Sequence, residues 1–138
     1  MVTLDANVWV AAFDPRDRFH RQSAALLRAL AQRGTRIHAP AFMTLEASCA
    51  LARRARDPAL ADAAFQKLQS HPSLVLHPVD EPSLARAREI GAAHLLRGAD
   101  ALYAATAALH AAPLVTWDDE LVARAGAQTP DAWLTAQP

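Results

Sequence analysis

The sequence lacks the features that stabilise small secreted domains or anchor a chain in a membrane. Its one cysteine, Cys49, cannot form a disulfide within the chain, and no CxxC pair exists to bind zinc through thiolates. No stretch reaches the roughly 18 to 20 continuous apolar residues of a membrane span. The first ten residues carry Asp5 where a signal peptide would be apolar. We therefore expect a soluble, unprocessed protein of the reducing cytoplasm.

An excess of charge of one sign is also missing. Fourteen basic residues balance fourteen acidic ones, and Lys67 is the only lysine. A net charge near zero excludes a strongly basic nucleic-acid module, although a local arginine patch would be hidden in this sum. The preference for arginine favours recognition of phosphates or carboxylates, and it equally fits a bias in genomic base composition.

What the sequence does contain is enough apolar material for a core. With 138 residues, 52% of them hydrophobic, the chain suits one compact domain. No repeat, linker or low-complexity tract interrupts it. We therefore expect a single domain over residues 1–138.

Segments with strand and helix patterns alternate along the chain. Short apolar runs predict strands at 2–4, 36–39, 74–76 and 113–116, with a weak fifth strand near Gln128. Helices are predicted at 7–13, 20–33, 41–56, 57–69, 81–94 and 99–110, followed by a short one ending near 125. Pro40 is expected in the first turn of its helix, and Gly98 is expected to break the preceding helix. This alternation predicts a three-layer α/β/α fold around a parallel sheet of four to five strands.

Four acidic residues stand where a predicted strand meets a helix or one turn into a helix. Asp5 and Asp118 directly follow strands, Asp100 begins a helix and Glu46 lies inside one. Each Asp alone could be a helix cap, worth about 1 kcal/mol. Because the carboxyl ends of parallel strands line one crevice, we expect the four carboxylates to converge there.

Glu46 needs a partner, because it lies in an apolar stretch of its helix. A buried and unpaired carboxylate would cost several kcal/mol or stay protonated. Either Arg53, further along the same helix, pairs with Glu46, or a cation does.

Converging carboxylates would repel one another by about 4 kcal/mol for each pair at roughly 4 Å, even near the protein surface. Mg²⁺ or Mn²⁺ would remove this penalty, because these ions prefer oxygen ligands. A bound ion that keeps some of its waters can activate one of them against a phosphate ester. The sequence therefore predicts a divalent metal site suited to phosphodiester hydrolysis.

Four short motifs carry a family resemblance: LDAN at the start, the isolated Glu46, RGADALYAATA and LVTWDDEL. Together they resemble the PIN-domain family of metal-dependent nucleases, and within it the VapC-type toxins of bacterial toxin–antitoxin pairs. The resemblance covers nearly the whole chain. It implies a PIN-like fold, Mg²⁺ or Mn²⁺ as cofactor, and a metal-binding and catalytic quartet formed by Asp5, Glu46, Asp100 and Asp118.

The resemblance also implies partners and supporting residues. It implies an endoribonuclease that acts on RNA, a cognate antitoxin whose tail inserts into the active-site groove, and a homodimer. Asn7 and Thr116 would assist the quartet. Asp119 departs from a strict four-acid pattern, and of its three roles, fifth ligand, helix cap or solvated neighbour, we favour the cap.

Other residues have both functional and structural interpretations. Arginines near the acids could hold RNA phosphates or simply complement helix dipoles; they are Arg53, Arg54, Arg56 and Arg97. Three aromatic residues could stack on bases, although core packing is the commoner role; they are Trp9, Phe13 and Phe42. The six histidines show no HxxxH or HExxH spacing, so we do not expect a histidine zinc site.

Two other functions compete with the nuclease hypothesis. A phosphatase of the haloacid-dehalogenase type also begins with a strand ending in Asp, but it needs a second Asp two residues later, where this chain has Asn7. A non-catalytic RNA- or protein-binding module of the same fold is the other alternative. The presence of all four acids argues against it.

Overall fold

A four-stranded parallel sheet forms the centre of the molecule in the computed structural model, which describes residues 1–136. The strands are β1 (Val2–Leu4), β2 (Ile37–Pro40), β3 (Leu74–His77) and β4 (Leu114–Val115). Their order is β3-β2-β1-β4, and all neighbours are parallel. The amino-terminal strand β1 is therefore an inner strand. Because β1 is parallel to both of its neighbours, a crossover connection is needed between each pair of strands.

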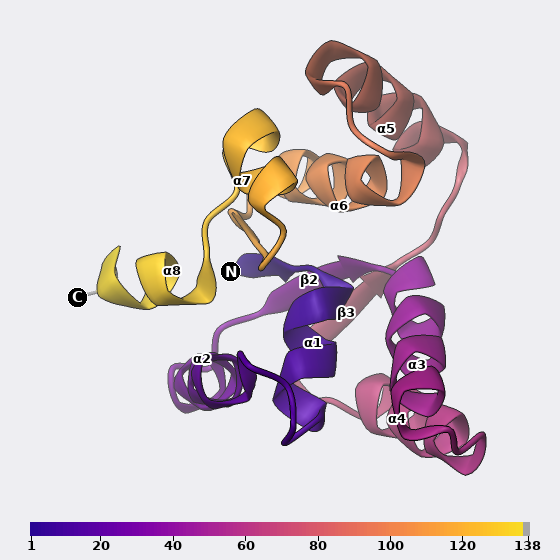
Figure 1. The fold of residues 1–138 in the computed structure, drawn as a ribbon. Helices are drawn as coiled ribbons and strands as arrows, with labels where there is room; N and C mark the ends of the chain where they lie inside the picture. The colour runs from indigo at the N-terminus through magenta and orange to yellow at the C-terminus, as the bar shows by residue number, and fades with distance from the viewer. Residues whose placement is uncertain (137–138) are drawn as a thin grey trace.

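Helices cover both faces of this sheet (Figure 1). One layer contains α1 (Ala6–Phe13), α2 (His20–Gln32), α3 (Phe42–Ala55) and α4 (Ala59–Gln69). The opposite side carries α5 (Glu81–His94), α6 (Gly98–Leu109) and α7 (Asp119–Ala125), while α8 (Pro130–Ala136) contacts α2. The predicted α/β/α arrangement is confirmed. Among residues 1–136, no helix has both the length and the apolar character needed to cross a membrane.

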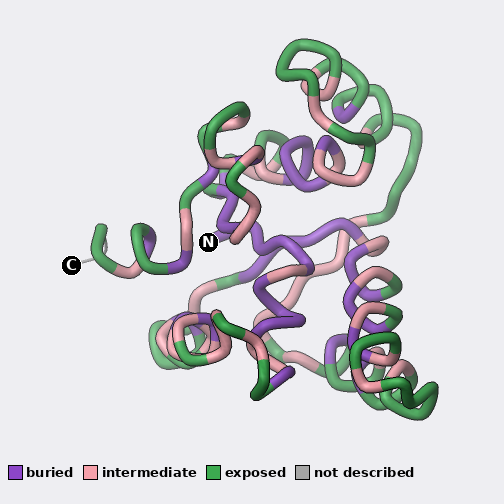
Figure 2. The backbone as a smooth tube through the Cα atoms, viewed as in Figure 1, coloured by how far each residue is buried: buried purple, intermediate pink, exposed green. Residues whose placement is uncertain are grey.

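The core lies between the sheet and the helices that face it, as Figure 2 shows by the burial of β1, β2 and most of α1, whereas β3 is only partly buried. Trp9 on α1 and Tyr103 on α6 are its largest fully buried side chains, one on each face of the sheet. Strand β1 is buried along its whole length. Burial of β1 in the core therefore fixes the position at which the following segment begins.

Several element boundaries differ from the sequence-based prediction. Pro40 ends β2 instead of starting a helix; the β1 partner stops at His38, so no neighbour requires an N–H from Pro40. Gly98 is the first residue of α6 and does not break α5, which ends at His94 as predicted, with Leu95 as its C-cap in the left-handed conformation at φ 55°. Near Gln128 there is only an isolated bridge to Val115. Helix α8 was not predicted.

Candidate active site

The four predicted acids line one pocket of about 280 Å³ at the carboxyl ends of the strands. Asp5, Glu46, Asp100 and Asp118 reach it from four segments that are distant in sequence. Asn7, Arg54 and Arg97 also line it. A larger hollow of about 440 Å³ beside α5 and α6 is lined mainly by alanine and has no carboxylate in its lining. Chemistry, and not size, therefore identifies the acidic pocket as the candidate site.

Asp5 lies at the centre of the site and is 6% exposed. It directly follows β1 and is the N-cap of α1, so it has the expected helix-cap role and also lines the pocket. The pKa of Asp5 is raised to about 6, chiefly by burial and also by the negative charges of Glu46 and Asp100, against hydrogen bonds from Thr116 and Asn7 that lower it. This carboxyl group is therefore half-ionised near pH 6 and keeps a small protonated fraction near neutral pH. A positive charge nearby would complete its ionisation.

Thr116 and Asn7 fix the orientation of the Asp5 carboxylate. The Thr116 hydroxyl donates to Asp5 Oδ2 over 2.6 Å, and Asn7 Nδ2 donates to the same oxygen over 2.8 Å and to Thr116 Oγ1 over 2.9 Å. The Trp117 amide donates to Asn7 Oδ1 over 3.1 Å, which defines the orientation of the Asn7 amide. The Asp118 amide donates to Thr116 Oγ1 over 2.9 Å. Asn7 and Thr116 thus connect Asp5 to the loop that carries Asp118.

Arg97 pairs with two of the four acids. Its Nε donates to Asp100 Oδ2 over 2.7 Å, and its Nη2 donates to Asp118 Oδ2 over 2.9 Å. The hydrogen bond to Asp100 and the charges of Asp100 and Asp118 raise the pKa of Arg97. The Arg97 side chain is 66% exposed, so solvent screens both ion pairs. The exposed Arg97 side chain can therefore turn away from the two carboxylates while the site stays folded.

The prediction that Asp119 caps a helix is wrong. Asp118 is the N-cap of α7, since its Oδ1 accepts from the Glu120 amide over 2.8 Å and from the Leu121 amide over 3.2 Å. Asp119 is the next residue and is exposed. The two oxygens of Asp118 are therefore divided, because Oδ1 holds the helix end and Oδ2 faces Arg97.

Glu46 has a partner that the sequence analysis missed. The Tyr103 hydroxyl donates to Glu46 Oε2 over 2.6 Å, and burial together with the charges of Asp5 and Glu46 raises the Tyr103 pKa. Arg53 is exposed and forms no ion pair with Glu46 among the described residues. Seven helical residues separate Arg53 from Glu46 by about 10 Å along the axis. The spacing of Tyr103, three residues after Asp100 on one helix, was a usable signal.

Two of the four arginines singled out from the sequence reach the pocket. Arg54 and Arg97 line it, whereas Arg53 and Arg56 are not part of its lining. Arg54 also pairs with Asp17 and, at 3.8 Å, with Asp14. The pocket therefore has two arginines at its border that could meet a phosphate.

Trp9 and Phe13 have the core role that was expected to be the commoner one, and a different aromatic pair lies near the pocket. Trp9 is fully buried in the core, and Phe13 packs against it. Instead, Phe19 and Trp117 stack with their ring centroids 4.0 Å apart and 3° between planes. They line a hollow of about 520 Å³ that shares Asn7, Arg54 and Asp118 with the acidic pocket; each of the two residues is only partly buried.

The pocket fits a hard divalent cation. Its donors are carboxylate oxygens, which Mg²⁺ and Mn²⁺ prefer, and no cysteine or histidine is in its lining. Burial is the main cause of the raised pKa of Asp5, and the negative charges of Glu46 and Asp100 add to it. Two neighbouring arginines offset this charge only from the rim. Such a site can hold a cation and, beside it, an anionic substrate.

Comparisons with known proteins bear on the family and the fold of the chain. The PIN domain family model matches residues 2–127. No curated protein matches the chain significantly in sequence. FitAcB from Neisseria gonorrhoeae is 21% identical in a solved structure, with a TM-score of 0.72 and coverage of 96% of this chain and 99% of that chain.

Two further solved structures share the fold. VapC20 of Mycobacterium tuberculosis, described as a toxin that cleaves the sarcin–ricin loop, is 18% identical, with a TM-score of 0.76 over 89% of this chain and 94% of that chain. A toxin–antitoxin complex from Klebsiella pneumoniae contains a chain 18% identical, with a TM-score of 0.69 over 94% of this chain and 98% of that chain. These likenesses support the fold, and the family model supports the assignment: the chain belongs to the PIN-domain family.

Proposed function

We propose that this PIN-domain chain is a metal-dependent endoribonuclease and the toxin of a type II toxin–antitoxin pair, acting in the cytoplasm as a single nuclease domain over residues 1–138. One observation carries the proposal. Four carboxylates from distant segments line one pocket, and the most buried of them, Asp5, has its pKa raised to about 6. Without a cation, repulsion among these carboxylates would cost free energy. With a bound cation, the same carboxylates become ligands of a functional site.

Asp5, Glu46, Asp100 and Asp118 are the residues that would hold Mg²⁺ or Mn²⁺. Nucleases of the PIN family are typically Mg²⁺-dependent. When bound, the ion lowers the pKa of a coordinated water and neutralises charge that develops on the phosphate. The ligand set of this chain matches that requirement in both charge and atom type.

The surrounding residues hold the acids in position. Thr116 and Asn7 both donate to Asp5 Oδ2, which fixes the carboxylate plane. The Tyr103 hydroxyl donates to Glu46 Oε2 and so orients the Glu46 carboxylate. Each acid can therefore present its remaining lone pairs to a ligand without searching among rotamers, which lowers the entropic cost of binding.

Arg97 and the aromatic pair would interact with RNA. The exposed Arg97 guanidinium can turn from the carboxylates toward a phosphate, where its fork of donors fits the anionic oxygens. The Phe19–Trp117 stack offers a surface for an unpaired base in the adjoining hollow, with the Arg18 guanidinium 4.4 Å from the Phe19 ring. A single-stranded or looped RNA is the substrate class that suits both features.

An antitoxin and a second copy of the chain are the proposed protein partners. The Klebsiella structure with a similar fold is described as a toxin–antitoxin complex. We expect expression of this chain alone to slow bacterial growth, and we expect co-expression of the proposed antitoxin to restore it. Size-exclusion chromatography with light scattering would measure the proposed homodimer.

Cleavage of a mixed RNA pool tests the nuclease. Purified wild type and Asp5→Asn are each incubated with Mg²⁺, with Mn²⁺ and with EDTA. We expect cleavage by wild type with either metal and none by the variant or with EDTA. If Asp5→Asn cuts as well as wild type, the quartet is not catalytic. If wild type binds RNA without cutting under any condition, the chain is a binding module.

A haloacid-dehalogenase-like phosphatase is disfavoured by the position of Asn7. That reaction needs a second acid there, whereas Asn7 donates hydrogen bonds to Asp5 and Thr116. An amide held in this way cannot act as a general acid.

A further inference from the structure

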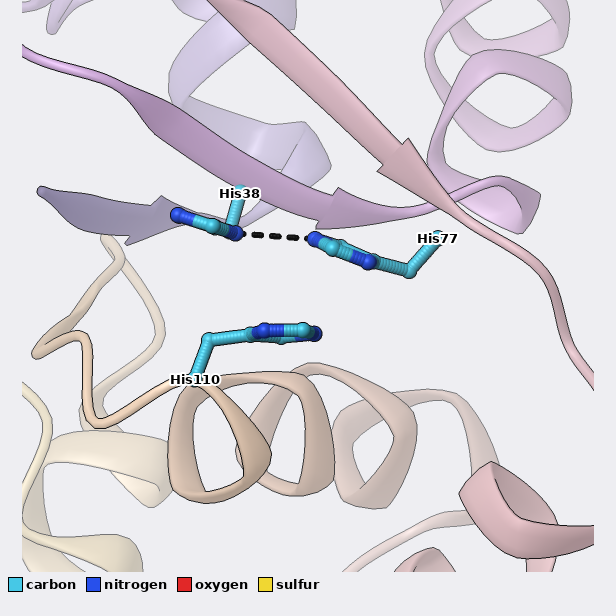
Figure 3. Close-up of side chains that lie close together, drawn as sticks. All are labelled: His38, His77 and His110. Atoms are coloured by element: carbon cyan, nitrogen blue, oxygen red, sulfur yellow. Dashed lines mark hydrogen bonds between the residues drawn. The ribbon is translucent and has the colours of Figure 1, made fainter.

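Three histidines that are far apart in sequence come together beside the sheet (Figure 3). His38 lies in β2, His77 ends β3, and His110 follows the last residue of α6. One ring nitrogen from each lies within 4.8 Å of the others. His38 Nδ1 and His77 Nε2 are 2.8 Å apart. The absence of HxxxH and HExxH spacing was the reason for not expecting a histidine zinc site, and that spacing did not reveal that these three residues lie together.

Sheet register explains how the cluster forms without any sequence motif. His38 lies opposite Val75, and Pro40 lies opposite His77, so His77 is two residues beyond the partner of His38. Alternate residues of a strand share a face, which places His38 and His77 on the same side of the sheet. The carboxyl end of α6 brings His110 over that face, with its ring stacked on His77 at 3.7 Å between centroids.

The cluster has the chemical properties of a ligand set. Burial, with the neighbouring His110 and His77, lowers the pKa of His38 to about 4, and burial with His110 lowers the pKa of His77. Both rings are therefore neutral at neutral pH and keep a lone pair for coordination. His38 is 5% exposed, and its Nε2 has no hydrogen-bond partner among the described residues. That Nε2 lies on the side of the ring away from His77, so the His38 nitrogen that a shared ligand could reach is Nδ1, which faces His77 Nε2 over 2.8 Å.

We propose that His38, His77 and His110 form a binding site for a borderline divalent transition-metal ion, Zn²⁺ in the first place, separate from the acidic pocket. Imidazole suits Zn²⁺, Cu²⁺ and Ni²⁺, whereas carboxylates suit Mg²⁺ and Mn²⁺. Three histidines leave one position of a tetrahedral zinc ion for water.

The required movement is small. Two nitrogens on a tetrahedral zinc ion are about 3.3 Å apart, given Zn–N bonds of roughly 2.0 to 2.1 Å. The contact between His38 and His77 must open slightly, and the widest separation, 4.8 Å, must shorten. His77 and His110 are only partly buried, so rotation of their side chains can supply this. The proton shared by His38 and His77 then resides on a ring nitrogen that does not bind the metal.

A metal there would tie β2, β3 and α6 together. Helix α6 begins beside Arg97 and carries Asp100 in its first turn, and β2 leads into α3, which carries Glu46. The ion would thus stabilise the elements that position two of the four acids, without touching those acids. A ligand that binds only the folded chain raises its melting temperature.

Zinc titration of the untagged full-length chain tests the proposal. Calorimetry is run with Mg²⁺ in excess, so that the acidic pocket does not compete for zinc. We expect one Zn²⁺ per chain and a rise in melting temperature of several degrees. His77→Gln keeps an amide near the position of Nε2, and His110→Gln is the second variant. Each should weaken zinc binding by about 100-fold or more.

Two control variants remove other soft ligands. His94 is an exposed histidine on α5, and Cys49 is an exposed thiol. His94→Gln and Cys49→Ser should bind zinc as wild type does. Circular dichroism checks that all four variants fold.

The histidine ring nitrogens provide a readout that needs no variant. In long-range ¹H–¹⁵N spectra of wild type, zinc should shift nitrogen signals of His38, His77 and His110 and leave those of His20, His71 and His94 in place. The proposal is overturned if wild type binds no zinc in excess Mg²⁺, if His77→Gln or His110→Gln binds it as tightly as wild type, or if the shifts occur at other histidines. None of these measurements depends on nuclease activity.

Discussion

The acidic pocket and the histidine cluster both gather side chains of one kind, yet they limit repulsion in opposite ways. In the pocket, the negative charges of Asp100 and Asp118 are balanced by the positive charge of Arg97, which lies at the solvent-exposed rim. In the cluster, charge is avoided, because burial and neighbouring rings keep His38 and His77 neutral. The pocket is therefore an ionised site with a removable counter-ion, and the cluster is a neutral site with lone pairs available.

This difference teaches that one sheet can present two kinds of metal chemistry. Oxygen donors with negative charge select hard ions, and neutral nitrogen donors select borderline ones. The pH dependence of the two regions should also be opposite. Acid removes the charge of the pocket and creates charge in the cluster.

The largest expected effect concerns activity. Asp100→Asn keeps the size of the side chain but removes one carboxylate from the pocket, and we expect RNA cleavage to fall by about 100-fold to 1,000-fold. Asp119→Asn is the matched control, since Asp119 is exposed and outside the pocket lining. Initial cleavage rates in Mg²⁺ measure both. Equal losses of cleavage rate in the two variants would mean that removing any negative charge lowers the rate, whether or not the carboxylate lines the pocket.

Acidification should destabilise the chain through His38. Its folded-state pKa of about 4 lies below its ordinary 6.5, so protons favour the unfolded chain. This contribution is present above pH 6.5 and is lost as the pH falls toward 4, with a total of about 3 kcal/mol. Denaturant unfolding in EDTA, compared with His38→Asn, measures it. A wild-type-minus-variant difference that does not change with pH would contradict the neutral cluster.

Asp5 should act in the opposite direction, by a similar amount. Its folded-state pKa of about 6 lies above its ordinary 3.8, so the folded chain holds the proton more tightly. This stabilisation is present below pH 3.8 and is lost as the pH rises through 6, with a total of about 3 kcal/mol. In EDTA, Asp5→Asn should therefore gain stability relative to wild type between pH 4 and pH 7. Added Mg²⁺ should stabilise wild type and leave the variant unchanged.

Tyr103→Phe tests a neutral group that serves the charged region. The variant removes only the hydroxyl that donates to Glu46 over 2.6 Å. We expect a loss of about 1 to 2 kcal/mol in unfolding free energy, because the bond has a charged acceptor and is partly buried. Chemical denaturation measures this. A stability equal to that of wild type would mean that water replaces the hydroxyl.

The smallest expected effect sharpens the comparison at its counter-ion. Arg97→Gln removes the cation that competes for Asp100 and Asp118, so Mg²⁺ should bind about two- to fivefold more tightly. Arg86→Gln is the control, because Arg86 pairs with Glu89 on the exposed face of α5. Calorimetric titration with Mg²⁺ distinguishes them. Weaker binding after Arg97→Gln would show that Arg97 positions the acids instead of competing for them.

The sequence predicted the parallel sheet and its helices because the signals are local. Apolar runs and turn residues define strands and helices, and an acid after a strand can be found by inspection, as at Asp5 and Asp118. What failed was also local. The predicted end of α5 at His94 is correct, but its cause was assigned to Gly98, whereas the helix ends with Leu95 in the left-handed conformation, which that residue type does not predict.

The partners of the site residues were not predictable because they depend on register and packing. Tyr103 reaches Glu46 across 57 positions, and His38 meets His77 across 39. Sequence spacing cannot reveal such pairs until strand order and register are known. Arg53 was considered for Glu46 because both lie on one helix, whereas the actual donor comes from another.

The inner position of β1 bears on how the chain is made. The Thr3 amide donates to the Pro113 carbonyl, and the Asp5 amide donates to the Val115 carbonyl. Strand β1 can therefore pair with β4 only after more than one hundred further residues have been synthesised. Until then a nascent chain contains Asp5 and Glu46 but has no Asp118 to join them. The acidic pocket, and with it the nuclease that we propose, is therefore incomplete until the segment that carries Asp118 has been synthesised.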